Sequence, residues 1–458
     1  MNIVGINISH HSSSCLVRDG KLVYLLEEER ISRQKMHGIS YVDLRFYGLE
    51  HLKKHVRVID HLAFSSYGRV GKLMDNVETV FEQFELIDRN GWEYFSDRYM
   101  SHGNAIIAKN KEVRFGNIGH SVDGALCWEN DRVIIHAVVK QIIDAGIKVK
   151  NVIFESDQHH IHHAICGYTF SDFDKASSLV MDAGGSFSLE DYKDISEVME
   201  SNNSNKSDKF GCKEVESIYY FGDNEMRSMH QHYDIHYLTL PSTSVYREEV
   251  LLKKDQKTFS HTLSAGILFN IITGDQFLGL GCGSDAGKTM GLSSYAELTQ
   301  KSQKMIIKDS DKKYFPDRIL LEDEWFYEVD GVMLTNPKLL DNLESSLKSK
   351  YDFKVRPDNM YYPSLLAKKL QIETEKLTIF LIKKVLEITP TKNVILSGGY
   401  FMNCVNNFKY RKYFSDDIKF FIDPIPYEAG TCFGCAAQVW MGFTGKKVKV
   451  PDNLYLGS

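Results

Sequence analysis

Short apolar runs separated by small polar turns open the chain, and they predict three consecutive β-strands. NIVGINI (2–8) is followed by the polar stretch SHHSSS (9–14), and then by the apolar runs CLV (15–17) and KLVYLLEEER (21–30). Asp19-Gly20 joins the last two runs, and an Asp-Gly pair between apolar runs is typical of a tight hairpin. We therefore expect a strand, a small-residue turn and a β-hairpin at the start of the chain.

A similar pattern begins again in the middle of the chain. SSLVMDAGGS (177–186) is an apolar run that leads into Asp182-Ala183-Gly184-Gly185, which we interpret as the start of a second hairpin of the same kind. Two such openings predict an α/β fold with two lobes and a central cleft, as in actin, Hsp70 and sugar kinases (the ASKHA fold). We expect the first lobe to span residues 1–175 and the second to span residues 176–445.

Helical periodicity is found in two further parts of the chain. Residues 131–147 place apolar side chains on one face, and residues 364–388 predict a long helix that ends before Thr389-Pro390. Residues 393–407 (NVILSGGYFMNCVNN) predict a strand, a Gly-Gly turn and a helix, in that order. Residues 198–212 are polar and predict an exposed loop in the second lobe.

The composition indicates an ordinary globular protein. The 458 residues are 43% hydrophobic and 25% charged. The net charge of −6 does not indicate binding to nucleic acid or to an anionic membrane. No apolar stretch reaches the roughly 18 residues that a membrane span needs. The eight cysteines form no paired framework. CFGC (432–435) is formally a CxxC pair, but its apolar surroundings favour packing over redox chemistry. With no signal peptide recognised, we expect a cytoplasmic protein with reduced thiols.

Three turns rich in small residues are candidate nucleotide-binding elements. They are HHSSS (10–14), DAGGS (182–186) and SGGYFMN (397–403). Glycine lets backbone amides approach a phosphate closely, and a helix that starts after the turn adds partial positive charge. Three such turns in one two-lobed chain favour nucleotide binding, although a Gly-Gly pair alone is common in ordinary turns. We expect the contacts from the following residues: Asp182, Gly184, Gly185, Gly398, Gly399 and Asn403.

Lys288 lies in a further glycine-containing segment, GSDAGKTMGL (283–292). The segment is not a Walker A loop, because the required spacing puts glycine at position 282, which is cysteine. From the spacing alone, Lys288 is either a phosphate contact or a solvated loop lysine.

Four histidines within five positions mark the stretch DQHHIHHAICGY (157–168). On a helix, His159 and His163 share one face, which is the arrangement of helical metal sites, whereas His160 and His162 project elsewhere. The stretch lacks the glutamate of a zinc-protease HExxH motif. Two imidazoles are an incomplete metal site, so an oxygen ligand must come from elsewhere in the chain. A surface cluster and hydrogen-bonded core histidines remain the alternatives.

Taken together, these motifs resemble the O-carbamoyltransferases of the NodU/CmcH type, and more distantly the tRNA threonylcarbamoyl transferase subunit. The resemblance rests on six segments in family order: residues 5–35, HHIHHAICGY (159–168), DAGG (182–185), DAGKTMGLSSYA (285–296), LSGGYFMNCVNN (396–407) and EAGTCFGCA (428–436). Residues 36–150 and 187–260 carry little of it.

This resemblance implies an ASKHA-like enzyme that transfers a carbamoyl group to an acceptor hydroxyl. The donor would be carbamoyl adenylate, made from carbamoyl phosphate and ATP. The resemblance further implies a bound metal, Fe(II) or another divalent ion, with His159, His163 and Glu428 as ligands. His10 or His11 would then be the base for the acceptor hydroxyl, which is a small molecule, a sugar or a nucleoside, and Lys288 would contact phosphate or acceptor.

Two positions depart from the family pattern. Aspartate is usual where this chain has Glu428, and the extra methylene moves the carboxylate by about 1.5 Å, which is large against a metal–oxygen bond near 2.1 Å. The usual His-Asp pair of the first turn is His10-His11 here, so one acid is replaced.

The family also implies an activating, YrdC-like domain, and residues 446–458 resemble the linker that leads into it. That domain would be a separate partner chain, the other half of a naturally split gene product, or a part that was cut off at the domain boundary. Two other functions stay open: a sugar or small-molecule kinase of the same fold with Asp182 as its catalytic aspartate near the phosphates, and a degenerate nucleotide-binding module. A homodimer is compatible with the sequence.

Overall fold

The structure is a computed structural model, and the residues that it describes fall into several ranges. These are 1–39, 44–66, 127–154, 158–188, 212–223, 225–234, 251–260, 262–275, 277–281, 285–296, 324–336, 339 and 352–451. The loop expected at 198–212 lies outside them except for Cys212, and so does the tail from residue 452 onward.

The first lobe is built on a five-stranded sheet in which the predicted opening strands are found. The sheet has the order β3-β2-β1-β5-β7, with bounds Lys21–Glu27, Ser13–Arg18, Asn2–Asn7, His61–Ser65 and Val152–Phe154. β1, β2 and β3 form an antiparallel meander, whereas β5 and β7 run parallel to β1. Asp19 and Gly20 have φ angles of 49° and 73°, as the predicted hairpin turn requires.

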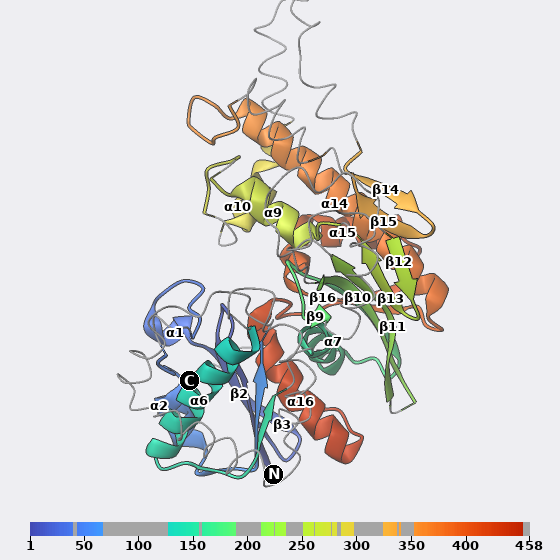
Figure 1. Ribbon diagram of the computed structural model, residues 1–458. Helices are drawn as coiled ribbons and strands as arrows, with labels where there is room; N and C mark the ends of the chain where they lie inside the picture. Colours follow the sequence, from blue (N-terminus) through green and yellow to red (C-terminus); the bar gives the residue numbers. More distant parts are fainter. Residues whose placement is uncertain are drawn as a thin grey trace, which may run out of the picture.

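The second lobe repeats this strand order. Its sheet runs β12-β13-β11-β10-β8-β16-β17, and β9 (Phe187–Ser188) pairs with β10. The bounds are Leu251–Lys254, Lys257–Ser260, Glu225–Asp234, Cys212–Gly222, Ala176–Met181, Asn393–Ser397 and Lys419–Ile422. From β11 to β17 the pattern is again three antiparallel strands followed by two strands parallel to the first. This repeated unit confirms the expected two-lobed ASKHA fold (Figure 1).

Two helices, α7 (His159–Phe170) and α16 (Thr431–Thr444), connect the lobes. Each of them packs on the sheet of the other lobe. α7 follows the last strand of the first sheet but packs on β8, β10 and β16 of the second, and α16 packs on β1, β2 and β5 of the first. The two helices also contact each other (Figure 1). The first sheet ends with β7 at Phe154 and the second begins with β8 at Ala176, whereas each of these two helices packs on the sheet of the other lobe.

Glycine permits the close approach of these helices. A Cβ on Gly434 of α16 would lie 1.9 Å from the carbonyl oxygen of His162 in α7, and one on Gly5 of β1 would lie 1.9 Å from the carbonyl oxygen of Cys432. Neither position accommodates a larger residue without a backbone shift.

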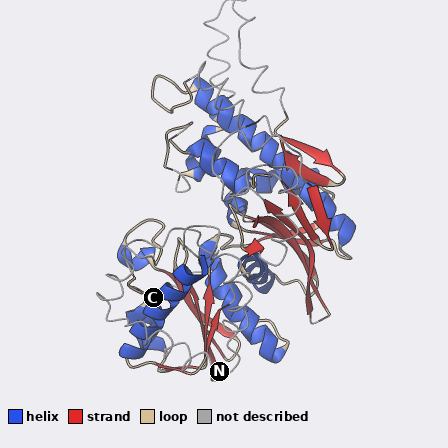
Figure 2. Cartoon of the chain, viewed as in Figure 1, coloured by secondary structure: helices blue, strands red, loops and turns tan. Residues whose placement is uncertain are grey.

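The other described elements cover the sheets (Figure 2). Two small pairings are β4 (Val58–Ile59) with β6 (Lys148–Val149) and β14 (Phe326–Val329) with β15 (Val332–Thr335). The helices are α1 (Glu29–Ser32), α2 (Leu49–His55), α6 (Cys127–Asp144), α9 (Ala265–Thr273), α10 (Ala286–Leu292), α14 (Tyr361–Ile388), α15 (Cys404–Tyr413), η3 (Gly399–Met402) and η4 (Glu428–Gly430).

The two helices predicted from periodicity, α6 and α14, are therefore present. α6 buries Ile134, Val138 and Ile142 in the core of the first lobe, and α14 ends at Ile388 with Thr389 as its C-cap. Across the described part of the chain, no helix has the length and apolarity needed to span a bilayer.

Candidate active site at the junction of the lobes

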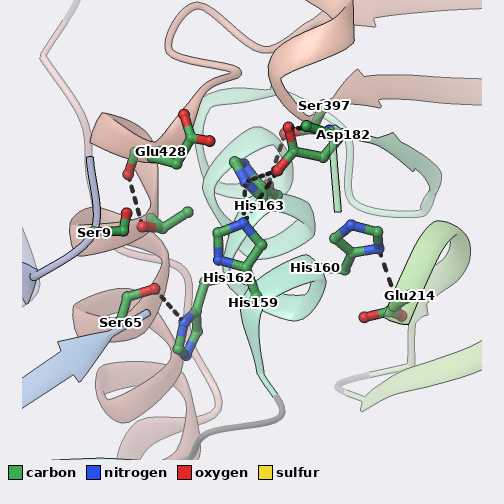
Figure 3. A network of polar contacts seen from close by, with 12 residues as sticks. Ser9, Ser65, His159, His160, His162, His163, Asp182, Glu214, Ser397 and Glu428 are labelled. Carbon is green, nitrogen blue, oxygen red and sulfur yellow. Dashed lines mark hydrogen bonds and ion pairs between the residues drawn. The ribbon is translucent and has the colours of Figure 1, made fainter. Parts of the chain in front are cut away.

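The first turn of α7 brings His159 and His163 together with Asp182, which directly follows β8 (Figure 3). Nε2 of His159 lies 3.2 Å from Nε2 of His163 and 3.2 Å from Oδ2 of Asp182, and Nε2 of His163 lies 3.7 Å from the same oxygen. All three side chains are buried. Two nitrogens and one oxygen therefore converge on one point.

This arrangement fits a divalent metal ion. A tetrahedral ion with bonds of about 2.1 Å separates its ligand atoms by roughly 3.4 Å, and the three separations measured here lie close to that value. One ligand atom from each of the three residues lies within 4.8 Å of the others. Imidazole with a single carboxylate suits iron, zinc or cobalt better than magnesium or calcium.

The electrostatics of the three residues also suit metal binding. Burial lowers the pKa of His159 to about 3, against the opposing effect of its hydrogen bond to Asp182. Burial alone would raise the pKa of Asp182, but its hydrogen bonds with His159 and His163 hold that pKa well below its usual value. At neutral pH the site therefore offers a neutral imidazole and a carboxylate, the forms that bind a cation.

The other two histidines of α7 have different partners, as the helical spacing predicts. His162 contacts Ser65 Oγ through Nδ1 at 2.8 Å and Gln438 Oε1 through Nε2 at 3.0 Å, so it links α7 to β5 and α16. A neutral ring with its hydrogen on Nε2 satisfies both partners. His160 faces the second sheet, where its Nδ1 lies 2.9 Å from Ser217 Oγ and 3.5 Å from Glu214 Oε1.

Replacing His162 with alanine is expected to lower stability and spare metal binding. The change removes two buried hydrogen bonds and leaves a cavity, so the free energy of unfolding should fall by about 3 kcal/mol. Denaturant unfolding measures the loss, and elemental analysis of the folded variant should show an unchanged metal content. A variant that loses its metal and keeps its stability would contradict this structural role for His162.

Glu428 lies near both α7 and the first turn of the chain, and its expected role as a metal ligand stays a prediction. It begins η4, and its carboxylate faces the first turn of the chain: Oε1 lies 3.1 Å from His10 Nε2, and Oε2 lies 3.7 Å from His11 Nδ1. The structure thus groups Asp182, rather than Glu428, with His159 and His163. Burial and then the charge of Asp182 raise the pKa of Glu428 to about 8, because two buried carboxylates share this region.

The glycines of the expected nucleotide-binding turns fall into two groups. Gly398 has a φ of 95°, and a Cβ there would lie 2.2 Å from the carbonyl oxygen of Met181; at Gly399 it would lie 2.9 Å from Asp182 Oδ1. This turn therefore adjoins the metal-binding set. At Gly184 and Gly185 the nearest atoms to an added Cβ belong instead to the side chains of Lys213 and His160.

Asn403 and Lys288 lie apart from the histidines. Asn403 caps α15: its Oδ1 accepts from the Asn406 amide at 3.2 Å and from Gln371 Nε2 at 2.8 Å, and its Nδ2 donates to Gln371 Oε1 at 3.1 Å. These contacts hold the side chain within the protein, and its expected nucleotide contact stays a prediction. Lys288 is exposed and pairs with Asp285 at 2.8 Å, and Lys35 of the first lobe lies 3.7 Å from the same carboxylate. Lys288 is thus at a surface where the lobes meet, and its phosphate contact stays a prediction.

Several residues of the site were not found from the sequence. Lys213 and Glu214 are buried next to the glycines of the second turn, and they come from β10. Ser397 Oγ lies 2.9 Å from the carbonyl oxygen of His163 and 2.6 Å from Oδ2 of the buried Asp423. Ser397 and Asp423 therefore help to hold α7 in position. Charged residues inside an otherwise apolar strand pattern, such as KEVESIYYF (213–221), were the available signal.

Comparison with known proteins gives one family and several distant similarities. A family model described as the carbamoyltransferase N-terminus matches residues 2–437. The uncharacterized protein sll1178 of Synechocystis sp. (strain ATCC 27184 / PCC 6803 / Kazusa) is 22% identical over 471 aligned residues, which cover 100% of this chain and 60% of the relative. This chain thus spans less than two thirds of that relative's length.

Among solved structures, full-length HypF in its phosphate- and nucleotide-bound form matches with a TM-score of 0.44 at 11% identity, over 97% of this chain and 56% of HypF. A ROK family protein from Streptococcus pneumoniae TIGR4, in complex with sucrose, matches with a TM-score of 0.34 at 8% identity, over 97% of this chain and 99% of that chain. These similarities are low, and the fold is established by the repeated strand order.

Proposed function

Because this chain belongs to the carbamoyltransferase family, we propose that it transfers a carbamoyl group from carbamoyl adenylate to a hydroxyl of a small molecule, a sugar or a nucleoside. The family match confirms the resemblance seen in the six sequence segments. The single observation that carries the proposal is the convergence of His159, His163 and Asp182 between two lobes of an ASKHA-like fold.

These three residues would hold Fe(II) or another divalent ion. When bound, such an ion supplies positive charge for the carbonyl oxygen of the carbamoyl group, where negative charge develops during acyl transfer. Asp182 also accepts the amide hydrogen of Ala183 at 2.7 Å, which fixes its carboxylate. The carboxylate can therefore keep Oδ2 directed at the two imidazoles without rearrangement.

The acceptor would approach from the first lobe. His10 lies on the turn after β1, is 41% exposed and reaches Glu428 on the opposite side of the site. A partly exposed imidazole is suited to accept the proton of a hydroxyl that attacks the donor. His11 is more buried, and burial together with His10 lowers its pKa to about 4, so it is neutral at pH 7.

The nucleotide part of the donor would lie on the turn at Gly398 and Gly399. There the backbone passes directly over Asp182, and the short helix η3 starts at Gly399. Glycine at these positions lets the turn lie against the Met181 carbonyl and the Asp182 carboxylate, which places its backbone next to the proposed metal ligands. The adenylate itself requires carbamoyl phosphate, ATP and an activating, YrdC-like domain or partner.

The test follows two labels in one reaction. The chain is mixed with a YrdC-like protein, carbamoyl phosphate labelled in its carbonyl carbon, ATP labelled in its γ-phosphate, and a panel of sugars, nucleosides and simple alcohols. We expect AMP, pyrophosphate and inorganic phosphate to form and the carbon label to enter an acceptor. Entry of the γ-phosphate label instead would show a kinase, and nucleotide binding with neither transfer would show a degenerate module.

A further inference from the structure

A buried lysine lies across the turn that carries Asp182, and we propose that it binds the phosphate of an adenylate. The lysine is Lys213, near the start of β10, and only 3% of its surface is exposed. A Cβ on Gly184 would stand 2.5 Å from Lys213 Cε and 3.0 Å from Nζ, so the end of the side chain lies directly on the turn. Gly184 is two positions after Asp182, which places the ammonium group beside the proposed metal ligands.

The glycine at position 184 makes room for this lysine. Gly184 is not among the glycines with a positive φ, so its backbone conformation is one that other residues also adopt. What a side chain at this position would meet is the end of Lys213. The glycine therefore serves the contact between the turn and the ammonium group.

Contacts on both sides fix the backbone of the turn. On the side of β10, the Gly185 amide donates to the carbonyl of Glu214 at 2.7 Å. On the other side, Ser264 Oγ, at the N-cap of α9, donates to the carbonyl of Ala183 at 2.8 Å. The strand that carries Lys213 and the turn are thus tied together, which gives the ammonium group a defined position.

The charges around Lys213 indicate the sign of the group that it binds. Burial and the charge of Asp182 raise the pKa of Glu428 to about 8, whereas the charges of His163 and Lys213 act in the opposite direction. Asp234 is directly opposite Lys213 in the register of β10 and β11. Carboxylates in this region would repel a phosphate, so a phosphate needs a cation of the protein beside it. Lys213 supplies that cation.

The inference deepens the proposed function, on which the identity of the adenylate rests. In carbamoyl adenylate the phosphate is joined to the carbamoyl carbon through one oxygen, so a donor held at the proposed metal ligands brings its phosphate next to them. The turn at Gly398 and Gly399 lies against Met181 and Asp182, and Gly184 is two residues further along the chain. Lys213 thus stands where a phosphate between these two turns is expected.

Affinities for AMP and adenosine test the inference, because these two probes differ only in the phosphate. They are measured by titration calorimetry on the untagged full chain after treatment with a chelator, so that contacts between phosphate and metal do not contribute. We expect the wild type to bind AMP at least about tenfold more tightly than adenosine. Lys213→Met keeps the length of the side chain and removes its charge, so it should weaken AMP binding about 10- to 100-fold and adenosine binding less than about twofold.

Two more variants complete the test. Lys213→Arg keeps the charge and should stay within about fivefold of the wild-type affinity for AMP. Lys419→Met removes an exposed lysine from β17, at the edge of the same sheet, and should bind both probes as the wild type does.

Three results would overturn the inference. They are equal wild-type affinities for the two probes, an unchanged affinity of Lys213→Met for AMP, and equal losses of AMP and adenosine binding in that variant. Inorganic phosphate that binds as tightly as AMP would also overturn it, because Lys213 would then hold a free anion. AMP binding that depends on Lys213, without carbamoyl transfer to any acceptor, would leave the inference standing and refute the proposed function.

Discussion

Replacing both His159 and His163 with alanine is expected to abolish metal binding at these residues and to lower the proposed carbamoyl transfer at least about 1,000-fold. The estimate follows from the several kcal/mol that a metal ion contributes to charge stabilisation in the transition state, at about 1.4 kcal/mol for each tenfold change in rate. Of the three proposed ligands only Asp182 would remain, and a single carboxylate is too few ligands to retain the ion. The measurement is the rate of label transfer to the acceptor, together with elemental analysis.

The controls separate loss of the metal from loss of the fold. Ile161→Ala lies between the two histidines on α7 and should retain the metal and most of the transfer rate. Adenylate formation by the activating partner should be unchanged with the double variant, because that step takes place elsewhere. Transfer at the wild-type rate by a double variant free of metal would exclude the proposed role of these imidazoles.

Gly434→Ala is expected to be among the most destabilising single substitutions in the chain, with a loss of about 3 kcal/mol or more in the free energy of unfolding. The new Cβ would stand 1.9 Å from the carbonyl oxygen of His162, and backbone cannot yield as a flexible side chain would. α16 and α7 must therefore move apart, which also displaces His163 from Asp182. The free energy of unfolding, measured with denaturant, and the metal content should therefore fall together.

Gly442→Ala is the matched control, because it lies on the same helix and a Cβ there meets nothing within 4 Å. Alanine favours the helix over glycine by roughly 0.5–1 kcal/mol, so this variant should be as stable as the wild type or slightly more so. Equal losses at the two positions would show that helix propensity, rather than the contact between α7 and α16, decides the effect.

Local patterns were sufficient to predict much of the fold. The Asp19-Gly20 hairpin, the long α14 and the shared face of His159 and His163 depend on residues that are close in the sequence, and turn chemistry and helical spacing describe them directly. The exchange of α7 and α16 between the sheets was not predicted. It depends on which surfaces pack in the folded chain: α7 buries most of its residues, and α16 buries those from Thr431 to Ala437.

The choice of carboxylate shows why the site was predicted only in part. Asp182 and Glu428 are both acids at the start of motifs, and no spacing rule says which one reaches α7. In the structure Asp182 follows β8, the strand on which α7 packs, and so it meets His159 directly. Glu428 is placed by η4, which also contacts α7, beside the first turn of the chain, and its role as a ligand stays a prediction. Pairings of this kind are set by tertiary packing across hundreds of residues.

The most direct test of the account is the position of a metal ion in crystals of the chain grown with Co²⁺, located by anomalous scattering. The account predicts a peak about 2.1 Å from Nε2 of His159 and Nε2 of His163, with Asp182 as the oxygen ligand. Crystals that bind Co²⁺ elsewhere, with no peak between these imidazoles, would contradict it.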